Sequence, residues 1–134
     1  MERLKWLFTL ESDYSYKTNL VLPEDYYFHT YKGDLLVYIA KDGTINVYKG
    51  YAWDGCSPKL KIGGQIIGTP DGKLVNNLPQ TYHASLIHDV LYQYIQFLPI
   101  KRSAADRIFL DLLAGFRYKY LYYAVVRLFG GFFI

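Results

Sequence analysis

A histidine directly followed by an aspartate, His88-Asp89, is the pair of residues in this chain whose types best suit chemistry. An imidazole titrates near neutral pH and can take a proton from water, while a carboxylate can hold a divalent cation. At 100° per residue, Ser85 and Tyr92 fall in the same helical sector as this pair, beside an apolar stripe. An isolated His-Asp pair is more often a structural hydrogen bond, so chemistry at this place requires further carboxylates.

Two other segments carry such carboxylates. Asp54 lies in the turn-forming stretch that follows Trp53, and Asp106 lies early in a helical segment after Ser103. Asp106 projects beside the apolar face of its helix, whereas Asp111 projects about 140° away toward solvent, so Asp106 is the better partner for His88. Each carboxylate also has a structural alternative. Ser103-x-x-Asp106 resembles a capping box, and Asp-Gly at residue 54 is ordinary turn chemistry.

The composition narrows the classes of protein. A chain of 134 residues with 15 tyrosines is expected to form one domain, 1–134, with its own core. The net charge of +3 comes from dispersed basic residues and does not predict nucleic-acid binding. Cys56 is the only cysteine, which excludes an internal disulfide and a zinc site built from several cysteines.

The two ends of the chain predict no secretion signal and no membrane span. The first residues lack the apolar core of a signal peptide, so the expected location is the cytosol or a virion. The apolar run 118–134 is interrupted by Lys119, Arg127 and a glycine pair, and is shorter than a spanning helix requires. It predicts a core helix, with an interfacial membrane helix as the lesser alternative.

Short aromatic segments and one clear hairpin predict a β-rich first part, residues 1–50. Strands are expected at 6–10 and 27–31, and Asp42-Gly43 predicts a tight turn between 34–40 and 44–49. Residues 51–80 are predicted to be a glycine-rich loop with a small hairpin at 65–75, because 55–80 holds five glycines and three prolines.

From Thr81 onward the apolar residues recur at three- and four-residue steps, which predicts a helical part, residues 81–134. A stripe that begins at Ala84 and ends at Leu98 predicts the first helix, which Pro99 terminates. The second is expected to start with Ser103 as its N-cap and to reach Phe116, tolerating Gly115, and the third to cover 120–129. The predicted fold class is α+β, a small antiparallel sheet followed by three helices.

The order of these segments resembles a phospholipase A2 active site, particularly that of the secreted bacterial and fungal branch. In that branch an Asp-Gly-Cys-Ser loop precedes a helix with His-Asp-x-x-Tyr, and a later helix supplies an aspartate. The corresponding segments here are Asp54-Gly55-Cys56-Ser57, His88-Asp89-Val90-Leu91-Tyr92 and Asp106. The disulfides that brace the secreted enzymes are missing, and the segment 62–80 between loop and helix is long.

The resemblance to phospholipase A2 implies a role for each matching residue. His88 would be the general base on a water, Asp106 its orienting partner, and Tyr92 a brace for both. Asp89, together with Asp54 or loop carbonyls, would bind calcium, a cation that takes oxygen ligands and can polarise an ester carbonyl.

A longer part of the chain is similar to a phage and prophage domain family of unknown function, number 1353. The motifs that match are Tyr51-Ala52-Trp53-Asp54-Gly55-Cys56-Ser57-Pro58, His88-Asp89-Val90-Leu91-Tyr92, Arg102-Ser103-Ala104-Ala105-Asp106 and Ala124-Val125-Val126-Arg127-Leu128-Phe129-Gly130. The main departure is Cys56 in place of the usual alanine. This similarity implies a phage origin, with the host cytoplasm or the virion as location, and no particular activity.

The leading hypothesis is therefore a calcium-assisted phage hydrolase acting on a lipid or another envelope ester. The alternative from another class is a non-enzymatic virion or host-interaction protein in which the polar cluster only joins loop and helices. Membrane lipid or other virion proteins are the expected partners. Two lesser alternatives are a metal phosphohydrolase that adds His29 to the site, and a Cys56 nucleophile activated by His88.

Overall fold

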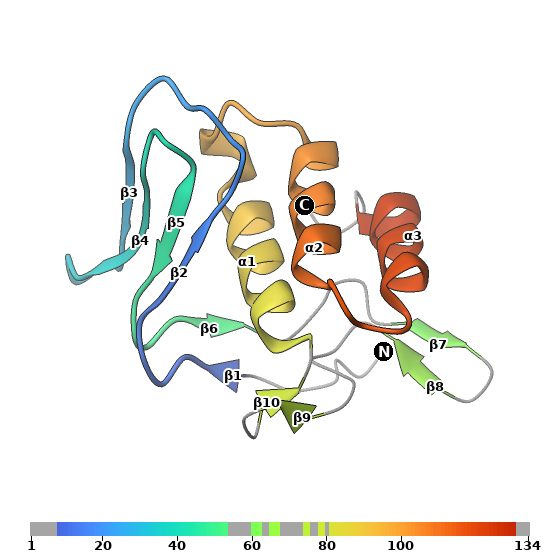
Figure 1. The fold of residues 1–134 in the computed structure, drawn as a ribbon. Helices are drawn as coiled ribbons and strands as arrows, with labels where there is room; N and C mark the ends of the chain where they lie inside the picture. The colour runs from blue at the N-terminus through green and yellow to red at the C-terminus, as the bar shows by residue number, and fades with distance from the viewer. Residues whose placement is uncertain are drawn as a thin grey trace. The chain divides into compact units, whose positions relative to one another are not determined.

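The structure is a computed structural model that describes residues 8–53 and 81–130, together with four short strands within 60–79. The chain divides into two compact units, one formed by Leu7–Trp53 and the other by Asp54–Ile134 together with the first six residues. The first unit holds only strands, and all the helices of the described residues lie in the second (Figure 1). This is the α+β fold that the sequence predicts.

The first unit contains a four-stranded antiparallel sheet in the order β2-β5-β4-β3. Its strands are β2 (Tyr14–Lys17), β3 (Tyr26–His29), β4 (Leu35–Ile39) and β5 (Thr44–Val47). The predicted hairpin is confirmed as β4 and β5. Gly43 between them has a φ of +93°, and a Cβ there would collide with the carbonyl oxygen of Leu20, so this turn requires glycine.

One face of β4 and β5 is fully buried, which gives the alternation expected of half-buried strands. Val37, Ile39, Ile45 and Val47 are all 0% exposed. Tyr27 of β3 stacks on its cross-strand neighbour Tyr38, with ring centroids 4.7 Å apart. A second, two-stranded sheet pairs β1 (Phe8–Thr9) with β6 (Ala52–Trp53) and so joins the two ends of this unit.

Three predictions for the strands require correction. Of the strand expected at 6–10, β1 covers Phe8–Thr9 and residues 6–7 lie outside the described residues, while the strand expected at 27–31 ends at His29. The strand β2 was not predicted, because Tyr-Ser-Tyr-Lys carries no aliphatic residue and depends on its pairing with β5. In place of one hairpin at 65–75, the second unit has two, β7 (Leu60–Ile62) with β8 (Gln65–Ile67) and β9 (Leu74–Val75) with β10 (Leu78–Pro79).

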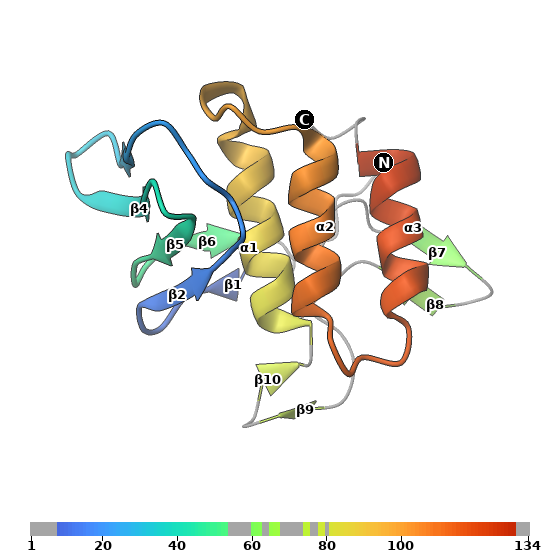
Figure 2. The ribbon, with the colours of Figure 1, turned by 45° about the horizontal axis from the view of Figure 1, so that its top comes forward.

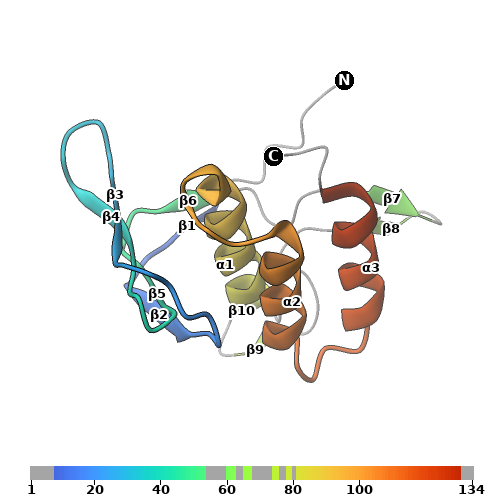
Figure 3. The same ribbon diagram turned by 90° about the horizontal axis from the view of Figure 1, so that it is seen from above.

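The helical part consists of α1 (Tyr82–Gln93), a short 3-10 helix η1 (Ile95–Phe97), α2 (Arg102–Leu112) and α3 (Lys119–Phe129). The three α-helices lie side by side, and successive helices run in opposite directions (Figures 2 and 3). An apolar core joins them, formed by Ala84, Phe109, Leu113, Phe116, Tyr122, Val125 and Val126. No helix within the described residues has both the length and the apolar character needed to cross a bilayer.

The helix boundaries differ from those predicted at three places. The helix α1 ends at Gln93, and η1 follows it before Pro99. Ser103 is not the N-cap, because α2 begins at Arg102 with Lys101 in the capping position. Gly115 lies outside α2 with a φ of +85°, so it serves the turn that follows the helix. The third helix is confirmed to within one residue, with Gly130 as its C-cap.

Candidate site at the junction of three helices

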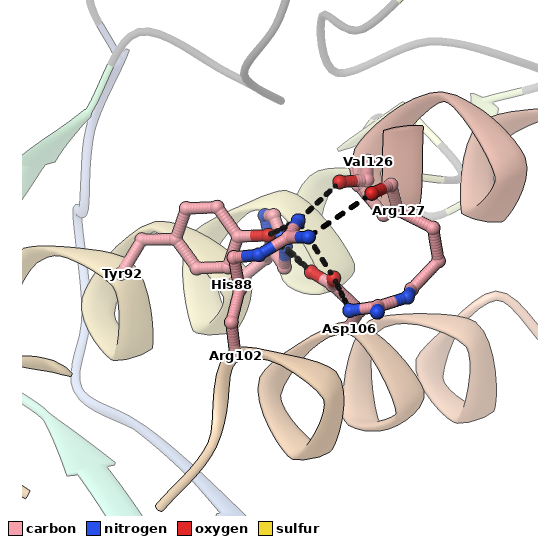
Figure 4. A network of polar contacts seen from close by, with 6 residues as sticks. All are labelled: His88, Tyr92, Arg102, Asp106, Val126 and Arg127. Atoms are coloured by element: carbon pink, nitrogen blue, oxygen red, sulfur yellow. Dashed lines mark hydrogen bonds and ion pairs between the residues drawn. The ribbon is translucent and has the colours of Figure 1, made fainter. Parts of the chain in front are cut away.

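A network of polar side chains lies where α1, α2 and α3 meet, with Asp106 of α2 at its centre (Figure 4). The helix α1 contributes His88 and Tyr92, α2 contributes Arg102 and Asp106, and α3 contributes Arg127. These five residues are called the Asp106 cluster below. Residues separated by up to 39 positions in the sequence meet here, so the cluster exists only when the helices pack.

Asp106 is 0% exposed, and both of its carboxylate oxygens accept hydrogen bonds. Oδ1 is 2.8 Å from Nε2 of His88 and also accepts the hydroxyl proton of Tyr92. Oδ2 lies 2.8 Å from Nη1 of Arg127 and 3.4 Å from Nη1 of Arg102. A buried carboxylate is tolerated only with such compensation, and here it comes from all three helices.

His88 is 1% exposed, deeper than its predicted position beside the apolar stripe implies. Its ring packs against the rings of Tyr92 and Phe109, at centroid distances of 4.0 and 4.7 Å. Nε2 faces an ionised carboxylate and therefore donates its proton to Asp106. Nδ1 then holds the lone pair, and it has no hydrogen-bond partner in the part of the chain that the structure describes.

The pKa values in the cluster follow from burial and from these contacts. Burial lowers the pKa of His88 below its ordinary value, more than the hydrogen bond and charge of Asp106 raise it, so the imidazole is neutral at pH 7. Burial alone would raise the pKa of Asp106, but hydrogen bonds from His88, Tyr92 and Arg127 outweigh it and lower the pKa. Burial, followed by the contact with Asp106, raises the pKa of Tyr92, which keeps its hydroxyl protonated.

Arg102 connects the cluster to the end of α3. Its Nη1 is 2.9 Å from the carbonyl oxygen of Val126, and its Nη2 is 3.1 Å from that of Arg127. Both carbonyls belong to the last turn of α3, and that of Val126 also accepts the backbone N–H of Gly130. A cation at this end also interacts favourably with the helix dipole, so Arg102 acts as a side-chain cap for α3.

Gly130 brings the backbone after α3 against the same cluster. A Cβ at this position would lie 2.5 Å from the hydroxyl oxygen of Tyr92 and 3.0 Å from Nη1 of Arg102. The backbone here is right-handed helical, with a φ of −57°, so any residue could adopt it. Space, and not backbone conformation, is therefore what requires glycine at this position.

The structure brings together three of the five residues that the sequence predicts for a site: His88, Tyr92 and Asp106. The capping-box alternative for Asp106 is wrong, because its carboxylate bonds to side chains of the cluster and α2 begins earlier than predicted. Asp89 is half-buried next to His88 on α1 and takes no part in the bonds to Asp106. Asp54 and Cys56 lie outside the described residues, and His29 lies in β3 of the other compact unit.

The predicted calcium site combines Asp89 with Asp54 or loop carbonyls, and only its Asp89 part lies within residues 8–53 and 81–130. There, no three histidine, cysteine, aspartate or glutamate side chains form a group that could hold a metal. Of the two predicted ligands, Asp89 is described and Asp54 lies outside the described residues, so calcium binding by this pair stays a prediction.

The sequence analysis gave Arg102, Arg127 and Gly130 no role in the site, although all three stand in the family motifs quoted above. The motifs therefore contained these residues, but not the reason for them. Arg102 and Arg127 surround a buried carboxylate, and the backbone at Gly130 comes close to other side chains, which only the packed helices show.

Comparison with known families supports the similarity found in the sequence. The family described as "Protein of unknown function (DUF1353)" matches residues 33–125, more than half of the chain. This chain belongs to the DUF1353 family. The match includes every α1 and α2 member of the Asp106 cluster, while Arg127 and Gly130 lie just beyond it. No curated protein and no solved structure matches the chain. The DUF1353 description names no activity, and the phospholipase A2-like site stays a prediction made from spacing.

Proposed function

We propose that this protein is a hydrolase in which His88 is the general base that activates water against an ester. The observation that carries the proposal is the state of its imidazole. It is buried and neutral, its Nε2 is fixed to Asp106, and its Nδ1 has no partner among the described residues. A fixed tautomer with one available basic nitrogen is the arrangement that general-base catalysis needs.

The proposed reaction uses only residues of the cluster. Nδ1 of His88 accepts a proton from water while the water oxygen forms a bond to the ester carbonyl carbon. The tetrahedral intermediate then collapses, the carbon–oxygen bond to the alcohol breaks, and Nδ1 returns the proton to that oxygen. Asp106 stabilises the imidazolium that forms between the two steps, and Arg102 and Arg127 keep Asp106 ionised, so it does not take the proton itself.

The proposed substrate is a lipid or another ester of the cell envelope, and the proposed setting is a phage. Both follow from the resemblances in the sequence. Calcium binding by Asp89 and Asp54 is part of the same proposal, but no step above depends on a cation. A calcium titration tests it separately, since a ligand bound only by the folded state raises the melting temperature, and Asp89→Asn should remove that rise.

The decisive experiment is His88→Gln. A glutamine amide at this position can still donate to Asp106, but it has no basic nitrogen. We expect release of fatty acid from phospholipid vesicles, or alcohol from a chromogenic ester, to fall by about 10²–10⁴-fold, the usual contribution of a general base. The melting temperature should change little.

The matched control is His83→Gln, a half-buried histidine on the same helix outside the cluster, which should retain activity. Full activity in His88→Gln would exclude the proposed mechanism.

A second function has an observation in its favour. Asp106 is fully buried and binds donors from all three helices, which is also what a structural network requires. On this alternative the protein is a virion or host-interaction component without activity. It predicts that the wild-type protein hydrolyses none of the esters, while Asp106→Asn still costs stability.

A further inference from the structure

The helix α3 has an exposed apolar face in a sector outside the core. Tyr120 is 67% exposed, Leu121 44% and Leu128 70%, and these residues fall within one sector of the helix at 100° per residue. A different sector of the same helix holds Tyr122, Val125 and Val126, which are buried in the core. Among residues 81–128, whose burial the structure describes, the large exposed apolar side chains other than Phe97 lie between Tyr118 and Leu128. Tyr120, Leu121 and Leu128 are called the α3 outer face below, and the exposed Tyr118 lies next to them as the N-cap of the helix.

Positive charge accompanies the α3 outer face. Cζ of Arg117 lies 5.5 Å from the centroid of the Tyr118 ring, and Nζ of Lys119 lies 5.0 Å from the centroid of the Tyr120 ring. No aspartate or glutamate occurs in the sequence after Asp111, and Asp111 itself is paired with Arg107. The asymmetry extends to the whole chain. Residues 54–134 contain nine lysines and arginines and five acidic residues. Residues 1–53 contain six lysines and arginines and seven acidic residues.

We propose that the α3 outer face docks the protein on an anionic lipid bilayer. Exposed leucines and tyrosines beside basic side chains, on a helix whose other face is held in a core, are the features of an interfacial helix. Tyrosine suits the headgroup level because its ring is apolar and its hydroxyl is polar. The two leucines favour lipid over nucleic acid, and the lack of acidic residues after Asp111 favours an anionic surface.

The location of this face links binding to the Asp106 cluster. The helix that would contact lipid also supplies Arg127 to Asp106, and Arg102 caps its C-terminal end. The link to catalysis rests on the proposed function, since docking would hold the His88 site next to a surface rich in lipid esters. Binding to a bilayer is measured independently of hydrolysis.

The test is flotation of the full chain with phosphatidylglycerol–phosphatidylcholine vesicles and with pure phosphatidylcholine vesicles. We expect binding to the anionic vesicles that weakens as salt rises, and at least tenfold weaker binding to the neutral ones. Leu121→Ser with Leu128→Ser should weaken binding by tenfold or more, because each leucine loses its apolar contact. The matched control is Val21→Ser with Tyr31→Ser, which removes two apolar side chains of the other unit that are more exposed than either leucine.

A second variant pair tests the charge. Arg117→Gln with Lys119→Gln should weaken binding about fivefold per charge removed. Lys32→Gln, whose ammonium also lies over a tyrosine ring, is its control and should bind normally. Absence of binding to anionic vesicles, or equal losses in variants and controls, would overturn the proposal. So would a dimer in solution that Leu121→Ser with Leu128→Ser dissociates. Vesicle binding that survives in His88→Gln, with no hydrolysis by any form, would support docking and reject the hydrolase.

Discussion

At the scale of single residues, Asp106 determines the polarity of the site. Its carboxylate is removed from water and receives donors from His88, Tyr92 and Arg127 at once. Removing a carboxylate from water costs several kcal/mol, so the buried charge needs each of these hydrogen bonds. A substitution that removes the charge therefore weakens the contacts of all three donors. The exposed pair of Asp111 with Arg107 offers a comparison on the same helix.

Asp106→Asn should therefore lower the free energy of unfolding by about 3 kcal/mol, since it leaves the guanidinium groups of Arg102 and Arg127 without their partner. Asp111→Asn removes an exposed carboxylate and should change the free energy of unfolding by less than about 0.5 kcal/mol. Urea denaturation of both variants measures the difference. Similar losses for the two would mean that Asp106 is not the centre of a buried network.

Gly130 is the second position where one residue decides the packing. Alanine in place of glycine at a helix end would by itself stabilise by up to about 1 kcal/mol. The collision of its Cβ with the Tyr92 hydroxyl should cost more, about 1–3 kcal/mol, so the net effect of Gly130→Ala is expected to be destabilising. Tyr92→Phe removes the colliding oxygen, and the same glycine change should cost less in that background. A double-mutant cycle measures this, and additive effects would contradict the contact.

At the scale of elements, α3 is held by an apolar face and by the guanidinium of Arg102. The helix has no side-chain cap at its N-terminus, and near its C-terminus Arg102 donates to the carbonyls of Val126 and Arg127. The same helix carries the α3 outer face. Its docking on the other two helices is thus the step that completes the Asp106 cluster.

Arg102→Met keeps the aliphatic stem and removes the cap, so α3 should become easier to open than α1. We expect a loss of about 2 kcal/mol, because hydrogen bonds from a charged donor contribute more than neutral ones. Hydrogen exchange should accelerate in 119–129 more than in 82–93. Arg107→Met, on the exposed side of α2, is the control and should leave both helices protected. Equal acceleration in α1 and α3 would show that Arg102 does not act on α3 in particular.

At the scale of the whole molecule, burial of His88 makes stability depend on pH. Because its pKa is lower in the folded state than the ordinary 6.5, the unfolded chain binds a proton that the folded protein excludes. Its contribution is complete above pH 6.5 and decreases as pH falls below that value, by at most about 1.4 kcal/mol per pH unit. Asp106, with a pKa lowered from 3.8, adds a further loss only at more acidic pH.

Denaturant unfolding between pH 5 and 8 should therefore show a free energy that is level above pH 6.5 and decreases below it. His83, whose pKa burial also lowers, contributes with the same sign, but it is only half-buried. His88→Gln should remove more of the slope than His83→Gln does. A slope that is unchanged in His88→Gln would mean that this histidine is not excluded from protonation by burial.

The local elements were largely predictable from the sequence. The Asp42-Gly43 turn, the helical period from Thr81 and the stop at Gly130 each depend on residues within a few positions of one another. The choice of Asp106 over Asp111 as partner of His88 was also correct, because it follows from helix geometry alone. Cap positions and helix ends were less accurate, since tertiary packing moves them by several residues.

The sequence by itself determined the α+β class, the helices and the types of residue that can do chemistry. Only the tertiary structure decided that Arg102 and Arg127 converge on Asp106, that His88 is buried, and that Gly130 touches Tyr92. The physical reason is that periodicity fixes the face of each helix on which a residue lies. The depth of a side chain and its partners on other helices depend on how the helices pack, which no local pattern records.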